Sequence, residues 1–599
     1  MWRRLRVGTR RALGRVLGQR DSTARIARGV AAGFFASAFP LPGLQIPLSL
    51  LAAWAVRGNK VAAIFPQFIS NAVTMAPLAA LQYMIGAWLW PGTPVGVADA
   101  ASALGTVMRE WEWGSLCQSA GHLLPDLVHL GPGILGPMIL GILVTGLAMA
   151  VAAYPLAVIV VFVWRMRRRS RRLRKGSPAR APRPLAIPEP REPAPPRDEI
   201  QTRYVRRPKQ LSLASAATLL ADGREAYPDM LAAIDAATIS VDLETYILKA
   251  DRTGTRFQEA LVRASRRGVC VRLLYDYVGS WGLPDGFVRP LLEAGVAVSV
   301  YRPPVFGRGF LALGHRDHRK ILLVDRRTFF TGGINIADEN LPVEEGGGWR
   351  DTEVRLEGPA MAAAGVRLFM QAWRKASAYG ETKTRAGRVK ATLRRLVLPV
   401  LPAPADREAP GPPVAPDEVA VQVIGNEEYR HRRRIRRAYL FAIKQARRYV
   451  FIENAYFIPD RGVRRALARA VKRGVLVAVA TAGRSDVPIA SYASRGVYSE
   501  LLAAGVRLFE WPEIMLHAKV AVIDDAWAIV GSYNFDRRSL FHQLEAVAMI
   551  ADPGFAVRLR AQLLGDFARC HEVTLFEHES RSWRRMLLES AAYALRRWL

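Results

Sequence analysis

The sequence contains the stretch His318-Arg-Lys320-Ile-Leu-Leu-Val-Asp325, which returns as His517-Ala-Lys519-Val-Ala-Val-Ile-Asp524. Six residues separate each Asp from a second signal, Gly332-Gly333-Ile-Asn335 in the first copy and Gly531-Ser532-Tyr-Asn534 in the second. Five residue types at the same offsets, present twice, exclude coincidence. The chain therefore carries a duplicated motif.

The duplication extends well beyond the motif. The stretch 260–271, which reads as an amphipathic helix stopped by Gly and followed by a buried strand, is repeated at 466–477. Shorter matches join 291–296 to 501–506 and 242–247 to 452–457. Short β-branched runs alternate with helices of mixed charge, so the pattern predicts an α/β fold of two tandem pseudo-symmetric lobes.

The spacing within the motif indicates phosphate chemistry. Residues 318 and 320 alternate onto one face of a strand, so imidazole and ammonium point into the same pocket. A Gly-rich turn then brings Asn335 back beside them, because Gly lets the backbone approach a phosphate closely. Two facing halves supply two His, two Lys and two Asn around a single phosphodiester.

This doubled pattern resembles the phospholipase D superfamily over residues 203–599. The resemblance implies one active site between two α/β/α lobes, with a histidine that attacks phosphorus and a second histidine that acts as general acid and base. We expect His318 to be the nucleophile and His517 the acid/base, although pseudo-symmetry leaves their order open. Lys320, Lys519, Asn335 and Asn534 are expected to hold the phosphate oxygens, without a metal or another cofactor.

The resemblance also implies a carboxylate that orients each histidine. Asp351 and Glu545 occupy the expected places, some 25 to 35 residues after the motif histidines. Asp325 and Asp524 complete the catalytic motif and are interpreted as structural anchors at strand ends. Ser532, at the position of Gly333 in the first half, is expected to donate one hydrogen bond near the phosphate.

The sequence around the motifs is similar to that of bacterial cardiolipin synthases, notably in 335–339, 349–358, 453–459 and 531–539. This similarity implies a phosphatidyltransferase that joins two phosphatidylglycerol molecules. Alternatives are a phospholipase D that hydrolyses glycerophospholipids to phosphatidic acid, a metal-independent nuclease, or a membrane scaffold without activity. The substrates implied are anionic phospholipids, which makes nucleic acid an unfavoured partner; the sequence does not determine the oligomeric state.

The N-terminal part predicts membrane attachment. Three stretches, 29–56, 61–98 and 134–164, contain no charged residue, and the last is longer than the roughly 20 residues that cross a bilayer. The first 20 residues carry seven Arg, and a basic cluster at 165–175 follows the last stretch. Both ends should stay in the cytoplasm, which requires an even number of crossings. Either 29–56 is re-entrant, or 134–164, with Pro155, is a hairpin; we favour the first.

The segment 29–91 resembles a small uncharacterised bacterial membrane domain. The whole chain has 85 Lys and Arg against 52 Asp and Glu, a net charge of +33, which attracts polyanions or an anionic lipid surface. The three cysteines form no metal-binding pattern. We therefore expect a multi-pass protein of the bacterial inner membrane with its catalytic part on the cytoplasmic side.

Composition gives the domain boundaries. Pro-rich stretches separate the parts, as expected of semi-rigid linkers. The final helix suits either an interfacial helix or ordinary packing. We expect a helical membrane domain at 1–165, a basic, Pro-rich linker at 166–202, a first lobe at 203–397, a Pro-rich linker at 398–418, and a second lobe with a C-terminal amphipathic helix at 419–599.

Overall fold

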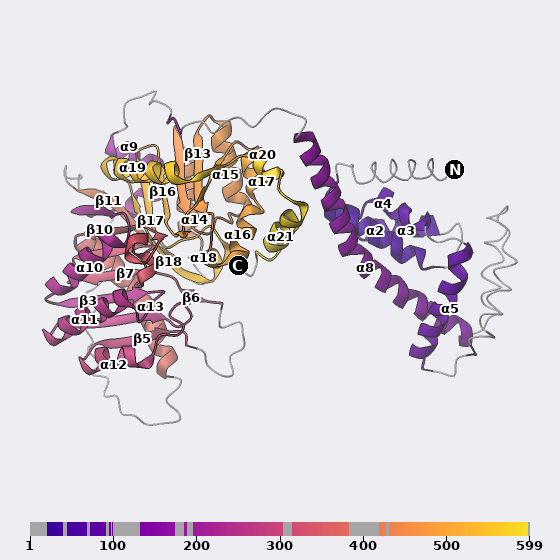
Figure 1. Ribbon diagram of the computed structural model, residues 1–599, viewed down its shortest axis with the longest axis horizontal. Coiled ribbons are helices and arrows are strands. Elements are labelled where there is room, and N and C mark those ends of the chain that lie inside the picture. Colours follow the sequence, from indigo (N-terminus) through magenta and orange to yellow (C-terminus); the bar gives the residue numbers. More distant parts are fainter. Residues whose placement is uncertain are drawn as a thin grey trace. The chain divides into compact units, whose positions relative to one another are not determined.

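The structure, a computed structural model, describes residues 21–39, 45–68, 72–91, 95–96, 99, 132–173, 185–187, 196–303, 314–381, 418–426 and 431–596. The chain divides into two units, Met1–Ser177 and Pro178–Leu599, and each is considered by itself (Figure 1). The predicted linker at 398–418 lies outside the described residues, apart from its last residue.

The first unit is helical. Its described elements are α2 (Thr23–Ser37), α3 (Gln45–Ala55), α4 (Lys60–Ile64), η1 (Phe65–Phe68), α5 (Ala72–Leu89) and α8 (Pro132–Leu173). Helices α5 and α8 approach closely at glycines: a Cβ on Gly86 would lie 1.7 Å from the Pro137 carbonyl oxygen, and one on Gly141 would lie 1.7 Å from that of Gln82. Small residues at a helix crossing are typical of membrane helix packing.

Helix α8 contains the segment Gly133–Arg165, with a mean hydropathy of 2.4. Over the described ranges it is the one helix long and apolar enough to cross a membrane. It runs without a break through Pro155, so the hairpin alternative for 134–164 is wrong. Apolar helices accommodate an internal Pro where neighbouring helices and local adjustments satisfy the freed backbone groups. Helices α2 and α3, of 15 and 11 residues, are each too short to cross. A re-entrant 29–56 stays a prediction.

The second unit contains two large sheets. The first has the order β2-β10-β8-β7-β3-β4-β5. Its strands are β2 (Ala216–Leu220), β3 (Ser240–Thr245), β4 (Cys270–Asp276), β5 (Ala297–Tyr301), β7 (Ile321–Val324), β8 (Thr328–Gly332) and β10 (Glu353–Glu357). The helices of this half are α10 (Gly223–Ala236), α11 (Arg252–Arg266), α12 (Asp285–Glu293) and α13 (Pro359–Glu381).

The second sheet has the order β1-β11-β18-β17-β16-β12-β13-β14-β19. Its strands are β1 (Ser212–Ala214), β11 (Val419–Asn426), β12 (Tyr449–Asn454), β13 (Leu476–Ala482), β14 (Arg507–Trp511), β16 (Lys519–Ile523), β17 (Trp527–Gly531), β18 (Gln543–Ile550) and β19 (His571–Val573). The helices are α9 (Arg197–Tyr204), α14 (Arg434–Gln445), α15 (Arg461–Lys472), α16 (Pro488–Arg495), α17 (Tyr498–Ala503), α18 (Arg537–Phe541), α19 (Pro553–Arg569), α20 (Leu575–Glu579) and α21 (Trp583–Ala594).

The two halves repeat the same topology, which confirms the predicted fold class. Strands β3, β4 and β5 run parallel, as do β12, β13 and β14. Helices α11 and α15 begin after the capping aspartates Asp251 and Asp460. They are followed by Gly268 and Gly474 at φ 90° and 88°, the left-handed conformation that ends a helix and that Gly adopts most readily.

The halves share one hydrophobic core. Leu323, Phe329 and Val354 of the first sheet belong to the same buried cluster as Val522 and Ala546 of the second. Strand β1 lies early in the chain yet pairs with β11 in the second sheet, which the sequence did not predict. The two sheets therefore support each other.

Helix α21 packs against its own half. Met586, Glu589 and Ala592 are buried, and the Tyr593 hydroxyl lies 2.9 Å from Nη1 of Arg464. Leu588 remains exposed. The inward face agrees with the packing alternative for this helix.

Candidate active site

Each motif histidine is placed by a short strand that crosses to the other half. Strand β6 (Arg316–Asp317) pairs in parallel with Gln543 and Leu544 of β18. Strand β15 (Met515–Leu516) pairs in parallel with β9 (Trp349–Arg350). Because parallel pairing in register continues by one residue, His318 comes to lie beside Glu545 and His517 beside Asp351. The active-site groups are therefore assembled across the two halves.

The carboxylates lie within contact of the histidine rings. Nδ1 of His318 is 3.2 Å from Oε2 of Glu545, and Nδ1 of His517 is 2.5 Å from Oδ2 of Asp351. All four side chains are buried. A carboxylate that accepts the Nδ1 proton leaves Nε2 with its lone pair, ready to act as nucleophile or base.

The motif lysines accompany the histidines. Nζ of Lys320 donates to the carbonyl of His318 at 2.8 Å. Nζ of Lys519 lies 3.6 Å from the Asp351 oxygen that faces His517. Burial and the charge of Lys519 lower the pKa of Lys320 to about 7. Two ammonium groups that repel each other in a buried site favour an anion between them.

The two asparagines are buried at the same place in each half. Asn335 Oδ1 accepts from the backbone N–H of Ile247 at 3.2 Å, while its Nδ2 is buried and has no hydrogen-bond partner within the described part of the chain. Oδ1 of Asn534 is also buried without one. Because an unmet buried amide group is costly, a ligand oxygen is the natural partner for Nδ2 of Asn335.

Burial and nearby charges lower the pKa of both histidines but shift the pKa of their two carboxyl partners in opposite directions. Burial, together with the charges of Lys320 and Lys519, holds the pKa of His318 well below its ordinary value. Burial and Lys519 also lower the pKa of His517. Although burial opposes it, Lys519 and His517 hold the pKa of Asp351 below its ordinary value. By contrast, burial raises the pKa of Glu545 to about 8. Both imidazoles are thus neutral bases near neutral pH.

Two serines hold Glu545. Ser532 Oγ donates to Oε2, the oxygen that faces His318, and Ser539 Oγ donates to Oε1 at 2.7 Å. From its position in the sequence Ser532 was expected to bond near the phosphate, whereas its hydroxyl donates to the carboxyl group of Glu545. Ser532 therefore acts on the group that orients His318.

The glycine pair of the first half is confined by the strand that carries Asp351. Gly333 occupies the position that Ser532 has in the second half, and a Cβ on Gly333 would lie 2.0 Å from Oδ1 of Asp351. Gly332 is confined in the same way, since a Cβ there would lie 2.4 Å from the carbonyl oxygen of Thr352. Asp351 thus fills the space that a serine side chain would need at position 333, and only Gly fits.

The motif aspartates lie at the far end of their strands, away from the histidines. Asp325 accepts from the backbone N–H groups of Thr238, Ile239 and Ser240 at 2.7–2.9 Å. Asp524 accepts from Arg447, Arg448 and Tyr449 in the same way at 2.7–2.8 Å. Both begin tight turns in which two successive residues have positive φ, 51° and 54° in the first half and 57° and 58° in the second. Such hairpin turns favour Asp, and these contacts are those of an anchor.

Two aromatic rings flank the histidines and were not singled out from the sequence. The ring of Tyr246 lies 4.9 Å from that of His318, and the ring of Trp349 lies 4.7 Å from that of His517. Ser539 was also missed. Both rings stand in stretches that repeat or adjoin the motif, but only the folded chain shows that they contact the imidazoles.

Similarity to known proteins agrees with this geometry. Residues 230–373 and 439–568 match the family described as cardiolipin synthase, PLD-like domain, and residues 8–172 match a family described as an uncharacterized protein conserved in bacteria. Cardiolipin synthase B of Escherichia coli is 36% identical over 368 residues, which are 61% of this chain and 84% of that protein. Cardiolipin synthase of Geobacillus kaustophilus is 31% identical over 386 residues, 64% of this chain and 72% of that protein.

Among solved structures, phosphatidylserine synthase of Haemophilus influenzae is similar in fold, with a TM-score of 0.50 and 13% identity, over 67% of this chain and 100% of that one. Its likeness supports the fold alone. The sequence similarity extends through both halves and both copies of the motif. The chain belongs to the cardiolipin synthase family, within the phospholipase D superfamily.

Proposed function

We propose that this protein joins two phosphatidylglycerol molecules by phosphatidyl transfer, through a phosphohistidine intermediate. The main observation behind the proposal is the pair of buried imidazoles, each with Nδ1 next to a carboxyl oxygen from the opposite half. This arrangement frees both Nε2 atoms, as covalent catalysis with a separate acid/base requires. The phosphatidyltransferase class also follows from the relatives, which are cardiolipin synthases.

In the first step Nε2 of His318 attacks the phosphorus of a bound phosphatidylglycerol. A P–N bond forms while the bond from phosphorus to the glycerol headgroup breaks. His517, protonated at Nε2 once the anionic substrate is bound, gives that proton to the leaving glycerol oxygen. Asp351 stabilises the imidazolium of His517 because it stays ionised beside the ring. The products are free glycerol and phosphatidyl-His318.

In the second step a hydroxyl of another phosphatidylglycerol attacks the same phosphorus. Neutral His517 removes the proton from this hydroxyl, and the P–N bond breaks as the new P–O bond forms. The product is cardiolipin, and His517 is again protonated for the next turnover. If water replaces the hydroxyl, the same steps give phosphatidic acid.

The developing charge on the non-bridging oxygens is met by Lys320, Lys519, Asn335 and Asn534. Two observations support this role. The positive charges of the two lysines repel each other, so an anion between them is favoured. Nδ2 of Asn335 donates no hydrogen bond among the described residues and can donate to a phosphate oxygen. Preorganised donors in a buried site stabilise a transition state more than mobile water does. Glu545 and Asp351 act on the imidazoles, and Asp325 and Asp524 act on the turns that follow the motif strands.

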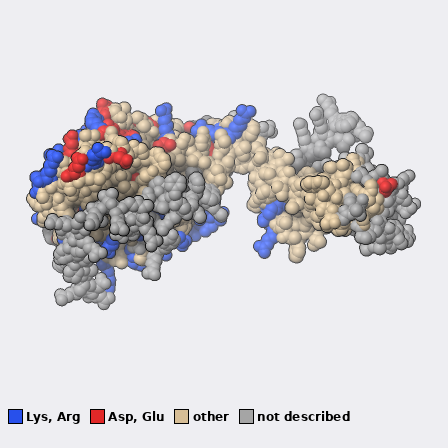
Figure 2. All heavy atoms as spheres, turned by 90° about the horizontal axis from the view of Figure 1, so that it is seen from below, with Lys and Arg blue, Asp and Glu red and all other residues tan. Residues whose placement is uncertain are grey.

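We also propose the predicted domain organisation and cellular setting. The helical domain at 1–165 and the basic linker at 166–202 would attach the lobes at 203–397 and 419–599 to the cytoplasmic face of the inner membrane. The apolar helix Gly133–Arg165 supports membrane association. On the face seen in Figure 2, the described surface of the first unit is mostly uncharged, whereas the second unit carries many Lys and Arg side chains.

The test supplies the full chain in detergent with headgroup-labelled phosphatidylglycerol and identifies the products by mass. Cardiolipin and free glycerol in equal amounts support the proposal. Phosphatidic acid with glycerol would assign hydrolysis instead. A His318→Ala variant serves as the control, because it removes the nucleophile. Cleavage of a single-stranded oligonucleotide without added metal, in the absence of lipid products, would assign the nuclease alternative.

A further inference from the structure

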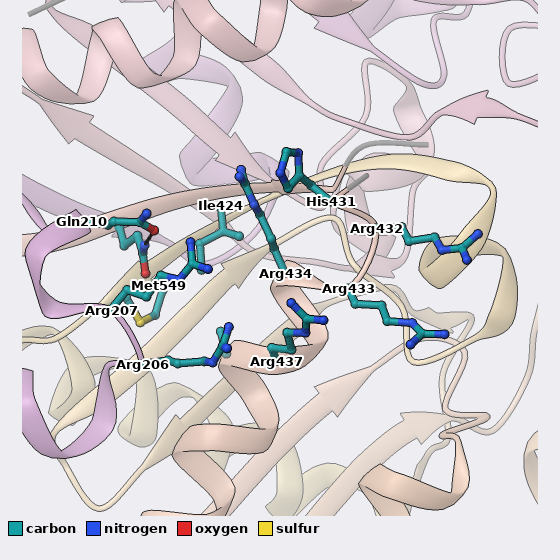
Figure 3. A pocket seen from close by; sticks show the side chains of 12 residues that line it. Arg206, Arg207, Gln210, Ile424, His431, Arg432, Arg433, Arg434, Arg437 and Met549 are labelled. Atoms are coloured by element: carbon teal, nitrogen blue, oxygen red, sulfur yellow. Dashed lines mark hydrogen bonds between the residues drawn. The ribbon is translucent and has the colours of Figure 1, made fainter. Parts of the chain in front are cut away.

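A hollow of about 330 Å³ lies between the segment that follows α9 and the start of α14. Arginines from both segments line it, and they are Arg206, Arg207, Arg432, Arg433, Arg434 and Arg437. Figure 3 shows Arg206 and Arg207 on one side of the hollow, and Arg434 and Arg437 from the start of α14 beside them. Among the described residues, the lining contains no Asp or Glu.

The backbone beneath these arginines is held firmly. Tyr204 and Val205, just before Arg206, are buried, and the Tyr204 hydroxyl donates to Asp524 at 2.8 Å. On α14, Ile435 and Ala438 are buried, so the helix turns Arg434 and Arg437 outward. Anchoring of both segments fixes the spacing of the cationic groups, which lowers the ordering cost of binding a ligand.

Among the described residues, the arginines of the hollow have no ionic partner, unlike Arg436 beside them. Arg436 on the same helix pairs with Asp460 at 2.5 and 2.7 Å. No carboxylate forms an ion pair with any of the six arginines over the described ranges, which leave out 427–430. Arg432 and Arg433 instead lie over the ring of Phe541, at 4.9 and 5.8 Å from its centroid. Converging cations repel one another unless an anion lies between them.

We propose that this hollow binds a phosphate group, that of an anionic phospholipid headgroup, at a second site separate from the catalytic histidines. Guanidinium groups bind phosphate oxygens with paired hydrogen bonds. Gln422 and Met549 of the lining face each other across β11 and β18, four residues from the pair Asn426 and Glu545. Four residues of strand span about 13 Å, so this phosphate is not the one under attack.

Lipid is favoured over a soluble phosphate or a nucleic acid by the rest of the lining and by the chain. Ile424, Ala438 and Met549 add an apolar part to the hollow, and the chain carries an apolar helix long enough to cross a membrane. The choice of lipid as the source rests on the proposed function, whereas the phosphate chemistry rests on the arginines alone. A headgroup held here would keep the catalytic unit against an anionic surface.

The test counts bound ligands, so it does not depend on turnover. Full-length protein with the His318→Ala substitution, in neutral detergent, is titrated with short-chain phosphatidylglycerol, and bound equivalents are counted by native mass spectrometry. We expect two equivalents. In the Arg434→Ala/Arg437→Ala variant the second should bind at least about tenfold more weakly, as loss of two charged hydrogen-bonding groups implies. Arg465→Ala/Arg469→Ala, which removes the same charge from exposed positions of α15, should retain both.

Equal loss in the two double variants would overturn the proposal, because it would show diffuse attraction by net charge. A single equivalent that the Arg434→Ala/Arg437→Ala variant still binds with the same strength would overturn it as well. Inorganic phosphate that displaces only the second equivalent would keep the phosphate site but overturn its lipid source. An oligonucleotide whose binding depends on Arg434 and Arg437, without a second lipid equivalent, would overturn the lipid proposal too. Failure of catalysis alone changes none of these counts.

Discussion

Nδ1 of His517 lies 2.5 Å from Oδ2 of Asp351, a carboxylate supplied by the other half of the repeat. The reciprocal contact joins His318 to Glu545 at 3.2 Å. Each histidine therefore depends on the half to which it does not belong. The parallel pairs β6–β18 and β15–β9 produce this exchange, because each places the residue before a histidine beside the residue before the opposite carboxylate.

Neutralising Asp351 should impair catalysis without unfolding the chain. Asp351→Asn removes the charge that stabilises the imidazolium of His517 and presents an amide that favours the wrong tautomer. We expect kcat to fall by about 10³–10⁴-fold, the size seen when a histidine loses its orienting carboxylate. Steady-state assays with phosphatidylglycerol and a melting curve measure the two effects. A loss of less than about tenfold in kcat would contradict the role given to Asp351.

Gly333 should not tolerate a side chain, whereas its counterpart Ser532 should tolerate the loss of one. A Cβ at Gly333 would lie 2.0 Å from Oδ1 of Asp351, so Gly333→Ala displaces that carboxylate from His517. We expect at least about a hundredfold loss of kcat from such a displacement. Ser532→Gly removes one hydrogen bond to Glu545, while Ser539 still donates to it. We expect about a tenfold loss there, on the scale of one hydrogen bond. Comparable losses in both variants would contradict this asymmetry.

The sequence predicted which residues form the site better than it predicted which of them contact one another. Spacing within 318–320 and 517–519 was enough to bring His and Lys together, because strand alternation is a local property. The exchange of carboxylates was not predictable, since it depends on pairing between strands far apart in the chain, such as β9 and β15. For the same reason Ser532 was expected at the phosphate and was found on Glu545. The sequence pattern likewise left open whether α8 continues through Pro155, and the structure shows one continuous helix there.

The activity of the free enzyme should decline as pH rises through about 7. Burial and the charge of Lys519 lower the pKa of Lys320 to about 7, so Lys320 loses its proton, and its attraction for phosphate, above that pH. Lys320→Arg keeps the positive charge at high pH and should move the falling limb of the kcat/KM profile upward, even if it lowers the maximal rate. Lys444→Arg, at an exposed position of α14, should leave the profile unchanged. If the falling limb of the kcat/KM profile stays at the same pH in Lys320→Arg, another group causes the decline.

Asp325 should contribute to stability and hardly to chemistry. Both of its oxygens accept backbone N–H groups. Asn tolerates the same positive φ, but its amide nitrogen cannot accept, so Asp325→Asn removes the charge and part of these hydrogen bonds. We expect the free energy of unfolding to fall by about 1–3 kcal/mol, the range for hydrogen bonds to charged groups. Although burial opposes it, the N–H groups of Ser240, Thr238 and Ile239 lower the pKa of Asp325.

Because the folded pKa is lowered, this stabilisation is present above the ordinary pKa of Asp and is lost as pH falls through the folded pKa. The difference between wild type and Asp325→Asn in denaturant unfolding should therefore shrink at acid pH. Asp235→Ala breaks an exposed pair with Arg263 and should cost less than about 1 kcal/mol at any pH. A large loss of kcat in folded Asp325→Asn protein would contradict the anchor role.

The role of His318 as nucleophile can be tested by trapping the covalent intermediate in a His517→Asn variant. A phosphatidyl ester of p-nitrophenol needs no acid to release its leaving group, so His318 can still attack, while the following step lacks its base. We predict a burst of about one p-nitrophenol per chain and, in peptide mass spectra, a phosphatidyl group on His318. The matched His318→Asn variant should show neither. An adduct on His517 in that variant, or no burst in His517→Asn, would contradict the assignment of His318 as the nucleophile.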